Sequence, residues 1–141
     1  RLPAMVGPKW IETRTQPIAE RDVVAALAAL ATFDAPPAEV ELGGAEILPY
    51  RDMLRRFAIL DGRRPPPIVP VPVLTPRLSS YWVRFVTSVD AGLARPLVDG
   101  LSEELLVHTP PPPGINDAPL GFDAAVREAL AAERAVPSAH G

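Results

Sequence analysis

The residues of this chain whose types and spacing could support chemistry lie in two stretches, the first close to the N-terminus. Trp10, Arg14 and Gln16 combine an aromatic face with hydrogen-bond donors that could bind an anionic or hydroxylated ligand. In a strand, alternation would place these three side chains and Glu12 on one face, as the wall of a pocket. The competing interpretation is that Trp10 packs in the core while Arg14 covers it on the solvent side.

The second stretch is a predicted helix of about three turns that begins at Thr75. Thr75-Pro76 is typical of a helix start, because threonine caps the first amides and proline fits the first turn. Arg77 stands in that turn against the helix dipole, which suggests a bound anion or a nearby carboxylate. Trp82 is the other candidate for substrate binding. Its alternative place is the core, in an apolar stripe with Leu78, Phe85 and Val89.

Several chemistries are excluded by what the chain lacks. It has no cysteine, and therefore no disulfide, thiol nucleophile or thiolate metal site. Its single lysine, Lys9, follows Pro8, so there is no phosphate-binding P-loop, and the glycines form no dinucleotide-binding turn. Two histidines without a His-Glu-x-x-His motif make a zinc hydrolase improbable. We expect no catalytic, cofactor-binding or metal-binding residue in this chain.

Composition and charge narrow the class of protein further. The chain of 141 residues has one domain's length, and its 19 prolines predict long irregular stretches. A net charge of −3 offers no attraction to nucleic acid or to an anionic membrane. Neither a signal peptide nor an apolar run long enough to span a membrane is seen, so we expect a cytoplasmic protein.

Apolar residues at helical spacing predict three further helices. They cover residues 20–31, residues 50–60 and a last segment that starts at Phe122 and includes Val126, Ala129 and Leu130. From Asp90 to Leu101 either a helix broken by Pro96 or two short turns can form.

Strand signals are fewer and shorter. Residues 39–43 alternate polar and apolar side chains like a half-buried strand, and residues 104–108 are a possible strand. The prolines between residues 63 and 76 limit any strand there to a short or edge strand. We therefore predict an α+β fold of helices with a few short strands that depends on contacts with something else.

Three segments carry a family resemblance. They read QPIAERDV at 16–23, LGGAEILPYRDM at 42–53 and PVPVLTP at 70–76. In order and spacing they resemble the C-terminal half of atypical short-chain dehydrogenase/reductases, the NAD(P)-binding proteins similar to nucleotide-sugar epimerases. The resemblance covers about residues 1–105 and identifies them as the substrate-side portion of a Rossmann-type protein. We interpret residues 106–121 as a proline-rich linker and residues 122–141 as a C-terminal helix and tail.

The resemblance implies that cofactor binding and substrate binding belong to different halves of a longer protein. NAD(P) and any catalytic tyrosine and lysine would belong to an N-terminal dinucleotide-binding half, while this chain closes over a small-molecule substrate without catalysing alone. Its expected partners are that missing half or a second copy of the chain. Extended members often carry a histidine where this chain has Ile18-Ala19-Glu20, which argues against sugar contacts from this stretch.

A second hypothesis makes the chain an interaction module. Arg64 to Pro70 satisfies the Arg-x-x-Pro-x-x-Pro pattern that polyproline-recognition domains bind. The following Val71, Val73 and Leu74 favour burial, which argues for a place in the fold. The run Pro110–Pro113 is a further exposed proline segment, for which a stiff linker is sufficient explanation.

Overall fold

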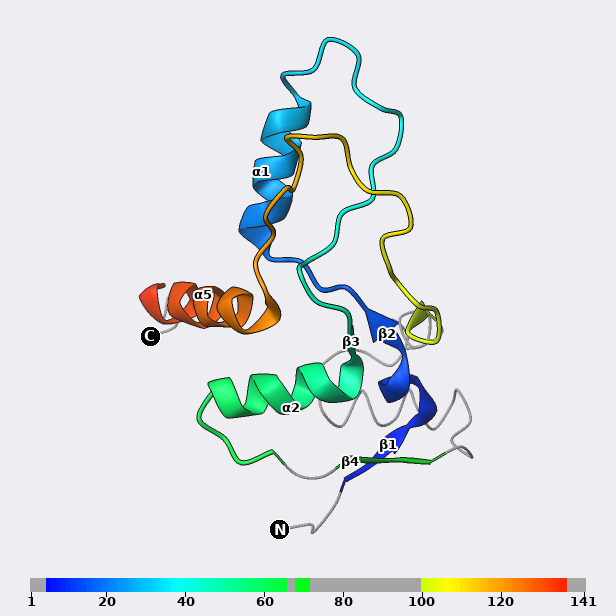
Figure 1. Cartoon of the computed structure of the whole chain (residues 1–141). Coiled ribbons are helices and arrows are strands. Elements are labelled where there is room, and N and C mark those ends of the chain that lie inside the picture. Colours follow the sequence, from blue (N-terminus) through cyan, green and yellow to red (C-terminus); the bar gives the residue numbers. More distant parts are fainter. Residues whose placement is uncertain (1–4, 66–67, 72–99, 137–141) are drawn as a thin grey trace.

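The computed structural model describes residues 5–65, 68–71 and 100–136, without the side chains of residues 5–9 and 68–71. Within these ranges the fold is α+β, as predicted (Figure 1). The predicted helix that starts at Thr75, with Arg77 and Trp82, lies outside the described residues, as does most of the segment from Asp90 to Leu101.

Three helices occupy the places that the hydrophobic periodicity predicted. They are α1 (Glu20–Leu30), α2 (Tyr50–Leu60) and α5 (Phe122–Ala135). Each has an acidic residue in its first turn, where the helix dipole favours negative charge. After α2 the chain reverses at Gly62, whose φ of 74° is in the left-handed region that glycine adopts without strain.

The described strands form two separate pairs. β1 (Met5–Pro8) runs parallel to β4 (Ile68–Val71), and β2 (Arg14–Thr15) runs antiparallel to β3 (Leu48–Pro49). β4 is short, as its prolines predicted. The β1–β4 pair lies at the end of the molecule opposite α1 (Figure 1).

Residues 10–16 do not form the continuous strand that alternation required. Lys9–Glu12 is a turn of 3-10 helix, closed by the Thr13 amide donating to the Trp10 carbonyl at 3.0 Å. Only Arg14–Thr15 is extended. The expectation that Trp10, Glu12, Arg14 and Gln16 share one strand face is therefore wrong, because the 3-10 turn breaks the period of two.

The strand predicted at residues 39–43 is also absent, and that at 104–108 reduces to one bridge between Leu105 and Thr15. The segment facing residues 39–43 contains Pro110, Pro111 and Pro112, which have no amide hydrogen to donate to a ladder. Side chains bind the backbone instead. Glu41 accepts from the amides of His108 and Thr109, and Asn116 donates to the Gly43 carbonyl at 2.8 Å.

Residues 106–121, which proline content predicted to be a linker, pack along the rest of the chain. The Leu120 amide donates to the Asp22 carboxylate in α1 at 2.8 Å, and the Leu120 carbonyl accepts from the Ala45 amide at 3.2 Å. Ile115 is 1% exposed. These bonds join the segment to α1 and to the loop before β3, so it is held as part of the fold.

The buried core of the described residues is small. Its members are Ile11, Ala19, Ala26, Ile115 and Phe122. No α2 residue is buried, although Leu54 and Phe57 belong to the apolar stripe of that helix. Large apolar side chains such as Val24 and Leu27 of α1 are more than half exposed, at 57% and 60%. Such surface is typical of chains that bury it against another molecule or segment.

Candidate functional site

Arg14, the first predicted ligand-binding residue of β2, is paired within the chain. Its guanidinium donates to both carboxylate oxygens of Glu104, at 2.5 and 3.1 Å. This two-pronged contact raises the pKa of Arg14 and lowers the pKa of Glu104. Because both side chains are about half exposed, an anionic ligand could reach Arg14 only in competition with Glu104.

Gln16 joins three segments through its side-chain amide. Its Nε2 donates to the Gly44 carbonyl at 2.9 Å, and its Oε1 accepts from the Val107 amide at 3.1 Å. The glycines beside it allow this approach. A Cβ on Gly43 would lie 2.6 Å from Cδ of Gln16, and one on Gly44 only 1.8 Å from the Pro17 carbonyl oxygen. The geometry gives Gln16 a structural role.

Trp10 packs against Tyr50 at the start of α2. The two rings meet edge to face, with centroids 5.8 Å apart and planes at 84°. The Tyr50 amide donates to the Thr13 carbonyl at 3.2 Å, and Glu12 pairs with Arg51 at 3.1 Å, so the 3-10 turn is fixed to the N-terminus of α2. Trp10 is half-buried, and its edge-to-face contact is with Tyr50 rather than with the buried core residues.

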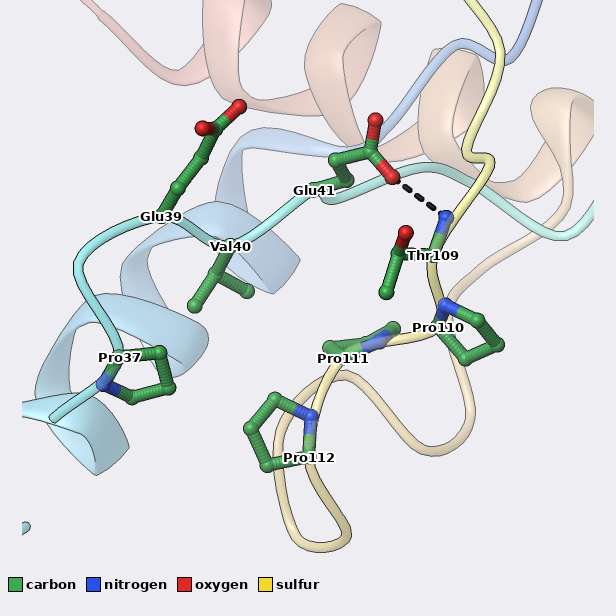
Figure 2. A pocket seen from close by; sticks show the side chains of 8 residues that line it. All are labelled: Pro37, Glu39, Val40, Glu41, Thr109, Pro110, Pro111 and Pro112. Atoms are coloured by element: carbon green, nitrogen blue, oxygen red, sulfur yellow. Dashed lines mark hydrogen bonds between the residues drawn. The ribbon is translucent and has the colours of Figure 1, made fainter.

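A cavity of about 450 Å³ lies between residues 37–41 and 109–112 (Figure 2). Its lining residues are Pro37, Glu39, Val40, Glu41, Thr109, Pro110, Pro111 and Pro112. Sequence reasoning missed this site because it assigned one side to a strand and the other to a linker. Two features of the sequence could have indicated the site. One is the pair of glutamates with a valine between them at residues 39–41, and the other is the proline run at 110–113, which cannot pair with a strand.

Glu41 holds the two walls of this cavity together. Its carboxylate accepts from the Thr109 amide at 2.5 Å and from the His108 amide at 3.1 Å. The Thr109 amide is the main cause of a lowered pKa of Glu41, so this carboxyl is ionised at neutral pH. Glu39, its neighbour on the rim, is exposed and has no hydrogen-bond or ion-pair partner among the described residues.

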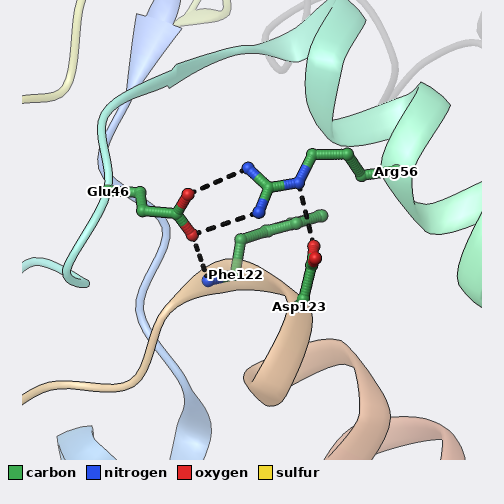
Figure 3. Close-up of polar contacts among 4 residues, drawn as sticks. All are labelled: Glu46, Arg56, Phe122 and Asp123. Atoms are coloured by element: carbon green, nitrogen blue, oxygen red, sulfur yellow. Dashed lines mark hydrogen bonds and ion pairs between the residues drawn. The ribbon is translucent and has the colours of Figure 1, made fainter.

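A polar cluster of Glu46, Arg56 and Asp123 fixes α5 to α2 (Figure 3). Arg56 contacts the two Glu46 oxygens at 3.0 and 3.3 Å and Asp123 at 2.8 Å, with its guanidinium carbon 5.4 Å from the ring centre of Phe122. Glu46 also accepts from the first amide of α5 at 2.8 Å. These bonds lower the pKa of Glu46 and raise that of Arg56. Each of the three charged side chains is paired within the cluster, so we assign the cluster a structural role.

The adjacent glycines at positions 43 and 44 serve the packing of the described chain. Gly43 and Gly44 lie against Gln16 and Pro17 with no room for a side chain. In the described ranges no group of three or more potential metal ligands is found, and no helix there is both long and apolar enough to cross a membrane. No family model, curated protein or solved structure matches the chain.

Proposed function

We propose that this chain is the substrate-side portion of an NAD(P)-binding short-chain dehydrogenase/reductase-like protein, and that it does not catalyse alone. The observation that carries the proposal is the parallel pairing of β1 with β4, in register from Met5 opposite Ile68 to Pro8 opposite Val71. The resemblance of segments 16–23, 42–53 and 70–76 to that family supports the same reading.

Parallel pairing is informative because all-parallel sheets occur almost only in α/β proteins, in which helices cover both faces of the sheet. Each strand of the β1–β4 pair has one strand neighbour among the described residues, and we propose that strands of the other half pair with the second edge. The connection from β1 to β4 includes α1 and α2, as a crossover between parallel strands requires. Further parallel strands from a dinucleotide-binding half would complete such a sheet.

The exposed apolar side chains favour the same partner. Leu54, Phe57 and Ile59 of α2 are 38%, 43% and 51% exposed. Leu54 and Phe57 share one face of the helix and Ile59 lies on another, so α2 has apolar area left to bury against an added sheet or a second copy of the chain. The small-molecule substrate would then bind where the two halves meet, as ligands often do between domains.

The proposal is tested by comparing this chain with a longer protein that adds the residues encoded before Arg1. Calorimetry should detect no NAD(H) or NADP(H) binding to the chain alone, because it has no phosphate turn. The longer protein should bind one of them with a Kd of about 1–100 μM. Low-micromolar binding by the chain alone, or an upstream sequence without a glycine-rich turn after a strand, would overturn the proposal.

Hydrogen exchange gives a second readout on the same pair of proteins. The amides of β1 and β4 should exchange fast in the chain alone, since a two-stranded sheet is marginally stable, and become protected in the longer protein. Equal exchange in both would show that no strands add to this pair.

The alternative, a polyproline ligand at Arg64–Pro70, is less well supported. Ile68–Pro70 pair with β1 in β4, so a domain binding the whole motif as a polyproline helix would have to displace β1. Arg64 itself is exposed, as such a ligand requires. A pull-down with polyproline-binding domains, lost on Arg64→Ala, would favour this alternative.

A further inference from the structure

The cavity between residues 37–41 and 109–112 has the features of a binding site. Its volume of about 450 Å³ is in the range of small-molecule sites. Its two walls are joined by hydrogen bonds, because Glu41 bonds the His108 and Thr109 amides and Asn116 bonds the Gly43 carbonyl. The space is therefore held open by polar contacts that a ligand need not break.

The apolar part of the lining suits a flat ring. Pro37, Val40, Pro111 and Pro112 surround the space between the two segments (Figure 2). Proline rings are rigid and pack well on aromatic groups, which is how aromatic-lined grooves recognise polyproline segments. Here the roles are reversed, with the prolines on the protein and the aromatic ring on the ligand.

The charged part of the lining is acidic. Glu41 is already occupied, because it accepts from the His108 and Thr109 amides and its Oε1 lies 3.7 Å from Nδ1 of His108, so the charge available to a ligand is that of Glu39. Glu39 and Glu41 lie on one side of the cavity, away from Pro37 and Pro112, and the eight lining residues include no lysine or arginine (Figure 2). Glu41 is ionised, and Glu39 has no partner in the described part of the chain. A cation on the ligand would be attracted to this side.

We propose that this cavity binds a small molecule that carries a flat apolar ring and a positively charged amine. The ring lies between Val40 and the proline side chains, and the amine lies near Glu39. The inference does not depend on the proposed function, because the site is built entirely from described residues of this chain.

Tryptamine is a suitable probe, with tryptophol and indole-3-acetate as neutral and anionic molecules bearing the same ring. Titration followed by NMR of the amides of Glu39, Val40, Glu41 and Thr109 should give a Kd of about 1 mM for tryptamine, an affinity that the ligand efficiency of small molecules allows. Tryptophol should bind about two- to fivefold more weakly, and indole-3-acetate more weakly still.

Glu39→Gln should weaken the binding of tryptamine two- to fivefold and leave the binding of tryptophol unchanged. The reason is that it removes an exposed charge with no partner among the described groups. Glu133→Gln on α5, another exposed glutamate, is the matched control and should change neither. Equal affinity for the cationic and anionic probes, equal effects of the two variants, or shifts absent from these amides at about 10 mM tryptamine would overturn the proposal.

Discussion

In and beside β2, Arg14 and Gln16 are bound to other parts of the chain, whereas the proline-lined cavity keeps one carboxylate, that of Glu39, without a partner in the described residues. Residue types alone favoured residues 10–16 as the binding site, because an aromatic ring beside hydrogen-bond donors is common in ligand pockets. The difference shows that a polar side chain is a candidate for ligand binding only where the fold leaves it without a partner. A donor already satisfied by the fold has little left to offer a ligand.

The largest effect is expected at the glycine pair that lets Gln16 approach. Gly44→Ala should destabilise the fold by about 3 kcal/mol or more, because its Cβ would meet backbone, the Pro17 carbonyl oxygen, at 1.8 Å. Urea unfolding measures this directly. Gly100→Ala, with no atom within 4 Å of the added Cβ, is the control and should be nearly neutral. Similar midpoints for the two variants would show that residues 16–17 and 43–44 are not packed as described.

Gln16→Leu tests whether this side chain serves the fold or a ligand. It leaves the Gly44 carbonyl and the Val107 amide without their partner, which should cost about 1–3 kcal/mol. The melting temperature should fall accordingly. An unchanged melting temperature would show that the fold does not need the Gln16 side chain. Gln16 would then again be a candidate for ligand binding.

Glu41 should make stability depend on pH, because its pKa is lowered in the folded state. A lowered folded pKa gives stabilisation that is present above the unfolded value of about 4.3 and is lost as the pH falls through the folded pKa. Urea midpoints of the parent chain should therefore decrease between about pH 5 and pH 3, and Glu41→Gln should flatten this decrease. Glu39→Gln, whose carboxyl has no described partner, should leave the profile unchanged. If both variants behave alike, Glu41 does not join the cavity walls.

The smallest effect is expected for the exposed pair of Arg14 and Glu104. Glu104→Gln should leave the melting temperature nearly unchanged, since water and salt screen this contact. It should, however, free the Arg14 guanidinium. Weak binding of phosphate gained by Glu104→Gln and absent in the double variant with Arg14→Gln would show that β2 is a ligand site held closed by Glu104. If Glu104→Gln gains no phosphate binding, the ion pair only joins β2 to the segment that contains Glu104.

The sequence by itself determined the helices α1, α2 and α5 and their approximate ends. Their signals are local: apolar residues recur at helical spacing, and Gly62 ends α2 with a backbone angle that glycine adopts freely. Local patterns also limited β4 to a short strand. None of these features needs knowledge of what lies across the molecule.

Only the tertiary structure decided how the remaining segments are used. Residues 39–43 have the alternation of a strand, but a strand forms only with a partner that can donate, and the segment opposite is rich in proline. The roles of Gln16 and Glu41 likewise depend on backbone amides more than sixty positions away in the sequence. Hydrogen-bond partners are set by proximity in space, which the type and spacing of neighbouring residues do not encode.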